Sequence, residues 1–188
     1  MKYISTRGNY EPVTSAEAIR LGMVPEGGLF VPQEVPLISL KQISQMVGQP
    51  YKKIAQTILK KYLTDYSNRE LEQALDSAYN EENFNHPEMA PLVQLEDNMF
   101  ILELWHGPTA AFKDMALQLM PYLLVEALKK QEIEDEIVIL VATSGDTGKA
   151  ALEGFRGIEG VNIIVFYPDQ GVSKVQETQM LTTKGDNT

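Results

Sequence analysis

The chain has 188 residues, 44% of them hydrophobic, and its 26 acidic against 16 basic residues give a net charge of −10. The apolar content is that of a globular protein, and the charge argues against binding nucleic acid or an anionic membrane electrostatically. With no cysteine and two histidines, disulfides, thiolate chemistry and a histidine-rich metal centre are excluded. Because there is neither an apolar signal region nor a run of about 18 apolar residues, we expect a cytoplasmic protein without a transmembrane helix.

The first part of the chain, to about residue 90, is predicted to be mostly helical. Capping boxes, and a proline that suits a first turn, mark helix starts at Thr14, Ser39, Pro50 and Ser67. The last of these helices carries an apolar face made of Leu71, Ala74, Leu75 and Ala78. Two interpretations are open for this segment: a family-specific cover on a larger enzyme, or a helical layer that serves packing alone.

The pattern changes after residues 85–91, where two prolines and several polar residues interrupt the helical period. The segments that follow are interpreted as strands at 99–104, 136–142 and 161–167, alternating with helices at 113–130, 147–155 and 172–181. This alternation predicts βαβ units, a parallel sheet and the α/β fold class. We therefore expect a mostly helical domain over residues 1–90 and part of a parallel-sheet domain over residues 91–188.

The last residues, 184–188, are polar turn formers at a place where another strand is expected. A sheet of three parallel strands would be thin and would leave an exposed edge. We therefore expect an N-terminal piece of a longer protein, and the alternative is a small complete domain.

The most informative segment is LWHGPTAAFKD at residues 104–114, which places Lys113 at the start of the predicted helix 113–130. The positive end of a helix macrodipole is unfavourable for an ammonium ion by a few tenths to about 1 kcal/mol. The same field favours the neutral amine, which is the form that attacks a carbonyl. Because a residue that breaks a local rule often marks a functional site, Lys113 is predicted to be a Schiff-base lysine.

A second motif, ATSGDTGK at residues 142–149, ends a predicted strand and opens a helix. Its glycines permit a tight turn and the close approach of backbone to a ligand. The free N–H groups of a helix start, with the hydroxyls of Thr143, Ser144 and Thr147, suit a carboxylate or a phosphate. The motif matches neither the Walker pattern nor the dinucleotide fingerprint, so a plain turn capped by Ser144 or Asp146 is equally open.

Topology is expected to bring the two motifs together. Each would lie in a loop that follows a parallel strand and precedes a helix, and such loops gather at the carboxyl edge of an open α/β sheet. Lys113 and Ser144 are therefore predicted to face one cleft. An amine beside an anion pocket suits pyridoxal phosphate, which binds through a lysine and holds an amino acid.

Three separated motifs resemble the threonine synthase family, in the fold-type II group of pyridoxal-phosphate enzymes. The segment 106–114 is similar to the family's cofactor-lysine motif, 143–148 to its substrate loop, and 3–8 with 27–32 to its N-terminal domain. The resemblance covers nearly the whole chain, and it implies that residues 91–188 form the first part of a three-layer pyridoxal-phosphate domain. The family's glycine-rich loop for the cofactor phosphate has no equivalent in this sequence.

The resemblance implies a role for individual residues. Lys113 would bind pyridoxal phosphate as a Schiff base and would serve as the base that transfers protons. Further cofactor contacts would come from Asp146, Phe112 and His106. The substrate carboxylate would be held by Thr143, Ser144, Gly145 and Thr147. Two of these roles have open alternatives, because His106 could instead order its loop and Phe112 could instead pack in the core.

Asp146 stands where the cysteine-synthase branch of the same group has an asparagine that contacts the phenolic oxygen of the cofactor. A carboxylate and a phenolate repel each other unless one of them is protonated. The protonation role of Asp146 is therefore left open by the sequence.

The reaction implied by the resemblance converts O-phospho-L-homoserine and water into L-threonine and phosphate, the last step of threonine biosynthesis. The protein that catalyses it would be a pyridoxal-phosphate-dependent carbon–oxygen lyase with a small amino-acid substrate. It would act as a monomer or a homodimer. The alternatives are another fold-type II lyase or synthase, of the cysteine synthase or threonine dehydratase type, and a non-catalytic ligand-binding module. Because the second half of the cofactor domain is missing from the sequence, we expect the chain alone to bind the cofactor weakly and to be inactive.

Overall fold

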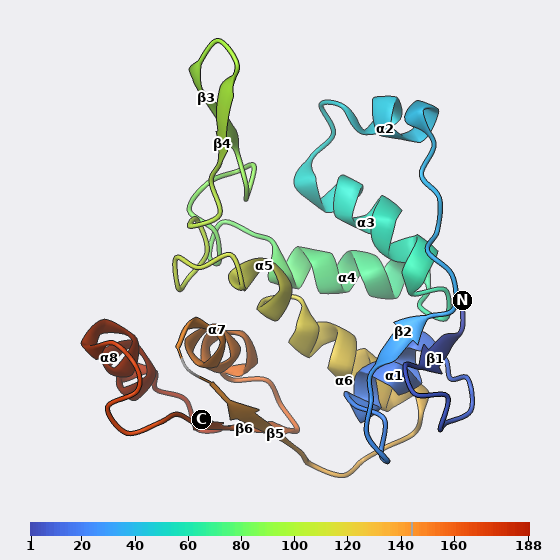
Figure 1. The fold of residues 1–188 in the computed structure, drawn as a ribbon, viewed down its shortest axis with the longest axis vertical. Coiled ribbons are helices and arrows are strands. Elements are labelled where there is room, and N and C mark those ends of the chain that lie inside the picture. The colour runs from blue at the N-terminus through green and yellow to red at the C-terminus, as the bar shows by residue number, and fades with distance from the viewer. Residues whose placement is uncertain (144) are drawn as a thin grey trace. The chain divides into compact units, whose positions relative to one another are not determined.

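The computed structural model describes residues 1–143 and 145–188 (Figure 1). The chain divides into two compact units: unit 1 comprises Met1–Ser77 and Tyr122–Glu134, and unit 2 comprises Ala78–Pro121 and Asp135–Thr188. The chain thus leaves unit 1, returns to it for one helix and leaves it again. The domain boundary near residue 90 stays a prediction, since compact units group contacts and do not define domains of a whole protein.

Unit 1 is mostly helical, as predicted, with one small antiparallel pair of strands. The strands are β1 (Tyr3–Ser5) and β2 (Phe30–Pro32). The helices are α1 (Ser15–Leu21), α2 (Leu40–Met46), α3 (Tyr51–Tyr62), α4 (Asn68–Ala78) and α6 (Met120–Lys130). The predicted apolar face of α4 is buried, with exposed fractions from 0 to 6% at Leu71, Ala74, Leu75 and Ala78.

Side-chain caps explain where these helices begin. In each predicted capping box the cap oxygen accepts a backbone N–H three residues on, at 3.2 Å for Thr14, 3.2 Å for Ser39 and 3.3 Å for Ser67. Such bonds satisfy N–H groups that have no partner inside the helix. Pro50 precedes α3, and Gly22 ends α1 with a positive φ of 67° that a residue without Cβ adopts freely. The four helix starts predicted from the sequence are confirmed.

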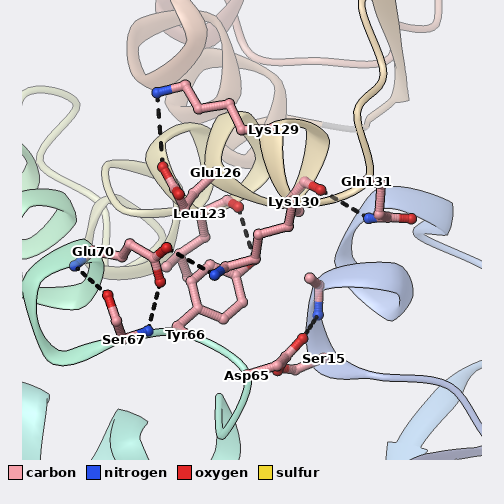
Figure 2. A network of polar contacts seen from close by, with 12 residues as sticks. Ser15, Asp65, Tyr66, Ser67, Glu70, Leu123, Glu126, Lys129, Lys130 and Gln131 are labelled. Atoms are coloured by element: carbon pink, nitrogen blue, oxygen red, sulfur yellow. Dashed lines mark hydrogen bonds and ion pairs between the residues drawn. The ribbon is translucent and has the colours of Figure 1, made fainter.

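A polar network fastens α6 to the start of α4 (Figure 2). The buried Tyr66 hydroxyl donates to the Leu123 carbonyl at 2.9 Å, and burial together with the nearby Asp65 charge raises the pKa of Tyr66 above its usual value. Lys130 Nζ lies 5.3 Å from the centre of the Tyr66 ring and donates to Glu70 Oε1 at 2.8 Å. The helix α6 is therefore anchored in unit 1 by both packing and charge.

The same network caps α1 (Figure 2). Asp65 accepts the backbone N–H of Ala16 at 2.9 Å and the hydroxyl of Ser15. Burial would raise the pKa of Asp65, but these hydrogen bonds outweigh it and hold the pKa below its usual value. A carboxylate at a helix N-terminus is also favoured by the helix dipole.

Replacing Glu70 by glutamine is expected to destabilise the chain by about 1 kcal/mol at neutral pH, after allowance for solvent screening. Burial alone would raise the pKa of Glu70, but hydrogen bonds from Lys130 and Ser67 lower it from 4.5 to about 2. A carboxyl with a lowered folded pKa adds stability above its unfolded pKa, and that stability is lost as the pH falls through the folded pKa. Urea unfolding should therefore show the difference between wild type and Glu70→Gln disappearing between pH 4.5 and about 2.

A matched control for this prediction is Glu72→Gln. Glu72 pairs with Lys53 on the surface, with both side chains 55% exposed. Because exposed pairs contribute little, this variant should follow the wild type at every pH. A Glu70→Gln variant that loses no more stability than Glu72→Gln would contradict the assignment.

The described residues of unit 2 form two separate pairs of strands and three helices. The pairs are an antiparallel hairpin of β3 (Leu92–Glu96) with β4 (Met99–Leu102), and a parallel pair of β5 (Ile137–Ala142) with β6 (Val161–Phe166). The helices are α5 (Asp114–Leu117), α7 (Asp146–Phe155) and α8 (Lys174–Thr182). The parallel register runs from Ile137 opposite Val161 to Ala142 opposite Phe166, with α7 as the crossover. The predicted α/β class is confirmed.

The prediction of three parallel strands is wrong in one strand. Strand β4 pairs with β3 in the hairpin and takes no part in the parallel pair. The turn formers Asp97 and Asn98 lie between two short strand-forming segments, which is a hairpin signal in the sequence. Lys113 therefore follows a hairpin and not a strand of the parallel sheet.

The predicted helix 113–130 is also wrong, because two helices occupy it. α5 ends at Leu117 and α6 begins at Met120. Pro121 lacks the N–H that a continuous helix would donate to the Leu117 carbonyl, and it suits the first turn of a new helix.

Among residues 1–143 and 145–188, no helix is long and apolar enough to cross a membrane.

The strand β5 was predicted to be buried, but its residues alternate between half-buried and exposed, and the buried residues of the pair lie in β6. Val161 and Ile163 of β6 are 2% exposed, where α7 packs against the sheet. Val138 and Leu140 of β5 remain 52% and 66% exposed. The helix α7 therefore covers one face of the parallel pair, and the near-continuous apolar run of β5 led to a prediction of more burial than this chain shows.

Candidate functional site

Lys113 is the residue that precedes α5, at the end of a loop ordered by a buried carboxylate. Asp114 is 1% exposed, and its Oδ2 and Oδ1 accept the backbone N–H and the hydroxyl of Thr109 at 2.9 and 2.7 Å. A Cβ on Gly107 would lie 2.5 Å from the Cβ of Asp114, so a side chain there would displace this carboxylate. The loop from Gly107 to Asp114 thus closes on itself and fixes the backbone that carries Lys113.

The Lys113 side chain is half-buried, and its recorded neighbour is an aromatic ring. Nζ lies 4.3 Å from the centre of the Phe112 ring, and Phe112 itself is 60% exposed, which argues against the alternative that it packs in the core. Among residues 1–143 and 145–188, no carboxylate forms an ion pair with Lys113.

Lys113 precedes a short helix and not the long one that was predicted. α5 is a single turn of 4 residues with Asp114 in its first position. A short helix has a weak dipole, and a carboxylate at its start offsets that dipole. The case for Lys113 therefore depends on its ordered loop and its lack of an ion pair, and not on a helix field.

Replacing Asp114 by asparagine tests the role of its carboxylate. This role was not predicted from the sequence. The amide keeps the shape, and its oxygen can accept the Thr109 N–H while its N–H₂ group donates to the Thr109 hydroxyl, but both bonds lose their charge assistance, so we expect a loss of about 1 kcal/mol in stability. Thermal unfolding measures it. Asp97→Asn, at an exposed turn, is the control and should leave the melting temperature unchanged. An equal melting temperature for both variants would rule out the clamp.

His106 is held by its own loop. Its Nδ1 lies 2.6 Å from Asn85 Oδ1, its Nε2 lies 2.6 Å from Glu103 Oε2, and its ring contacts that of His86 at an angle of 44°, with centroids 4.9 Å apart. Both ring nitrogens are thus engaged within this part of the chain. This geometry favours the loop-ordering alternative, and the cofactor contact of His106 stays a prediction.

The second loop is organised around one hydroxyl. Thr143 Oγ1 accepts the backbone N–H groups of Gly145 and Gly148 at 3.1 and 3.2 Å and donates to the Gly145 carbonyl at 3.2 Å. The Thr143 side chain therefore caps α7, and its hydrogen is already used. Thr147 is exposed in the first turn of α7. Ser144, predicted to bind substrate, lies outside the described residues.

The loop is packed against α8. Gln176 Nε2 donates to Asp146 Oδ1 at 2.7 Å. A Cβ on Gly148 would overlap Thr143 Cγ2 and lie 2.9 Å from Val165 Cγ1, so this position requires glycine. The loop was predicted from the sequence, but Gln176 was assigned no role in it, although the Ser-x-x-Gln capping box beginning at Ser173 marks the start of α8.

Helix packing, and not a common sheet edge, links the two motifs. α5 contacts α7, and a Cβ on Gly154 would overlap the Leu117 carbonyl oxygen and lie 2.9 Å from its carbonyl carbon. The backbones therefore touch where Gly154 leaves room. Among the described residues, Lys113 and Phe112 lie together, as do Thr143, Gly145 and Asp146, while no recorded side-chain contact joins the two groups.

A parallel β–α–β unit, an ordered lysine loop and a glycine-containing loop at the start of the crossover helix define an α/β protein. The family model described as "Threonine synthase N terminus" matches residues 2–79. The chain belongs to the threonine synthase family and corresponds to the N-terminal portion of its members.

Individual relatives agree along the whole chain. Threonine synthase of Pseudomonas aeruginosa is 41% identical over 188 residues, covering 100% of this chain and 39% of that protein. Threonine synthase of Schizosaccharomyces pombe is 36% identical over 195 residues, covering 100% of this chain and 38% of that protein. The chain thus spans about two fifths of the length of these relatives.

Solved structures give the same result. Pyridoxal-phosphate-bound threonine synthase from Brucella melitensis superposes with a TM-score of 0.85 at 38% identity, covering 96% of this chain and 38% of that one. Threonine synthase from yeast superposes with a TM-score of 0.87 at 34% identity, covering 99% of this chain and 39% of that one. The similarity therefore extends to the folded chain.

Proposed function

We propose that the protein containing this chain is a threonine synthase, which converts O-phospho-L-homoserine and water into L-threonine and phosphate. It would be a pyridoxal-phosphate-dependent carbon–oxygen lyase acting on phosphates. The observation that carries the proposal is the half-buried Lys113 amine, without an ion pair among the described residues, on a loop fixed by Asp114. Threonine synthases that match the whole chain support it.

The residues present fit part of a pyridoxal-phosphate site. Lys113 offers an amine for the carbonyl carbon of the cofactor, and the exposed Phe112 ring beside it offers an apolar surface for the cofactor ring. The start of α7 offers N–H groups that attract an anion. When bound, pyridoxal phosphate supplies an electron sink that stabilises negative charge on the substrate carbons.

Lys113 would act twice in this reaction. Its Nζ would first hold the cofactor covalently, and the amine released when substrate binds would then carry protons to and from the substrate carbons. The half-buried position beside Phe112 limits the water around Nζ. The chemistry is thus assigned to one nitrogen on a loop that Asp114 keeps in place.

The second loop would bind the substrate carboxylate. Because the Thr143 hydroxyl is used as a cap, its part would be to keep the Gly145 and Gly148 amides in position. Thr147, exposed in the first turn of α7, would donate its hydroxyl to the carboxylate. The full set proposed for the carboxylate is Thr143, Ser144, Gly145 and Thr147, with Asp146 and His106 proposed on the cofactor side.

The test uses the full-length protein with added pyridoxal phosphate and O-phospho-L-homoserine. Equal amounts of phosphate and L-threonine are the expected products. Borohydride reduction followed by peptide mapping should place the cofactor on Lys113. Formation of a keto acid from O-phospho-L-homoserine instead would indicate another fold-type II enzyme, and absence of both label and turnover would indicate a non-catalytic binding module.

A further inference from the structure

Gln176 uses both ends of its amide to connect α8 with the loop that begins α7. Its Oε1 accepts the backbone N–H of Ser173 at 3.1 Å, which closes the capping box of α8. Its Nε2 donates to Asp146 Oδ1 at 2.7 Å. One half-buried side chain therefore both caps a helix and holds a carboxylate in the proposed cofactor loop.

The backbone at Gly145 is shaped around this amide. A Cβ on Gly145 would lie 2.5 Å from Gln176 Nε2 and 2.9 Å from its Cδ, so the missing side chain admits the glutamine. Further along, Lys149 Nζ donates to Thr183 Oγ1 at 2.8 Å and fixes the other end of α8. Contacts at both ends of α8 make it a support for the first turn of α7.

The chemistry of the pair determines what Asp146 presents to a ligand. A glutamine N–H₂ group only donates, so it holds the Asp146 carboxylate as an acceptor with one oxygen turned to α8. If the Asp146 carboxylate could rotate freely, both of its oxygens could face the cofactor. The phenolic oxygen of the cofactor can also carry negative charge, so the two groups would repel each other. The orientation of this charge is therefore set by Gln176.

We propose that Gln176 is a positioning residue that orients Asp146, and with it the loop at the start of α7, toward the bound cofactor. This inference rests on the proposed function, because it assigns Asp146 to the cofactor side of the site. It adds a residue from a third segment, 30 positions from Asp146 in sequence, to the two motifs already described.

Two identical capping boxes allow a matched experiment. Gln42 closes the box of α2, where its Oε1 accepts the Ser39 N–H at 3.0 Å, as Gln176 does in α8. A glutamate at either position keeps this acceptor, so both caps survive. In Gln176→Glu, however, the second oxygen faces the Asp146 carboxylate and the two repel.

The readouts are the affinity for pyridoxal phosphate and the pH midpoint of its visible absorption band, in the full-length protein. Gln176→Glu is expected to weaken cofactor binding about tenfold. It should also move the midpoint to higher pH, because added negative charge stabilises the protonated cofactor. Gln42→Glu should match the wild type in both. A merely structural cap would give the same result for both variants.

Reversing the pair gives a rescue. In Asp146→Asn combined with Gln176→Glu, the donor and the acceptor exchange places, and cofactor affinity should recover relative to Gln176→Glu alone. If Gln176→Glu does not fold, Gln176→Met against Gln42→Met carries the same comparison.

The inference is overturned if Gln176→Glu binds and titrates the cofactor as the wild type does, or if Gln42→Glu shows an equal effect. Wild-type protein that takes no borohydride label on Lys113 would overturn the proposed function together with this inference. Label on Lys113 with no effect at Gln176 would overturn the inference alone.

Discussion

Replacing Lys113 by alanine in the full-length protein is expected to abolish the borohydride label and to lower threonine formation by about 10³-fold or more. The amine would be both the covalent anchor of the cofactor and the group that moves protons, so its removal takes away two contributions at once. Among the described residues, Lys113 carries no ion pair that would give it a structural role. Thermal unfolding should therefore change little.

Two variants make this result specific. Lys113→Arg keeps a positive charge but cannot form the covalent link, and it should be as inactive as the alanine variant. Lys129→Ala removes a lysine that is 68% exposed at the end of α6 and should retain full activity and label. Lys113→Ala protein that still showed the label would place the cofactor on a different lysine.

Enlarging Gly154 is expected to disrupt the backbone contact between α5 and α7. A Cβ there would overlap the Leu117 carbonyl oxygen, which belongs to the backbone and has little freedom to move aside. Overpacking of this kind costs about 1–3 kcal/mol, which exceeds the gain of about 1 kcal/mol that alanine brings over glycine in a helix. Gly154→Ala should therefore lower stability, and Gly154→Val should lower it further.

The sign of the change decides this prediction. If α5 and α7 were not in backbone contact, Gly154→Ala would raise the melting temperature, because helix propensity alone would act. Because α5 follows directly on Lys113, separating α5 from α7 should also weaken pyridoxal phosphate binding. Thermal unfolding and cofactor titration on the same samples measure the two effects together.

The helices of unit 1 were predictable because their first residues are determined by local hydrogen bonds. A cap and its partner N–H lie three residues apart, so Thr14, Ser39 and Ser67 identify their helices without tertiary information. Pro121 also indicates a break between two helices. The break was not predicted, because the apolar residues on both sides follow a helical period. Local rules thus give most of the helix boundaries.

Strand partners were not predictable in the same way. β4 has an apolar pattern that suits a hairpin or a parallel sheet, and only pairing with β3 distinguishes them. The pair β1 and β2 joins residues 3–5 to 30–32, and no pattern within either segment reports the other. Lys113 was placed near the second loop on the assumption that β4 belongs to the parallel sheet. That assumption is wrong, because β4 pairs with β3.

The candidate site was predictable in its motifs and not in its supports. Lys113 and the loop at 143–148 were identified from residue types that chemistry requires. Gln176 and Gly154 act through contacts with segments about 30 residues away or more, and a sequence gives no distance between such segments. Asp114 was visible beside Lys113, but its burial against Thr109 appears only in the folded loop.

The path of α6 has a consequence for how such proteins can be rearranged in evolution. This helix follows the lysine loop along the chain, yet residues 122–134 are part of unit 1, where Leu124 and Ala127 are 2% and 0% exposed. The region matched by the family model, residues 2–79, ends well before it. Deletion or exchange of residues 2–79 would remove the residues that bury α6, while α6 itself would remain. The segments 2–79 and 122–134 are therefore expected to be inherited together.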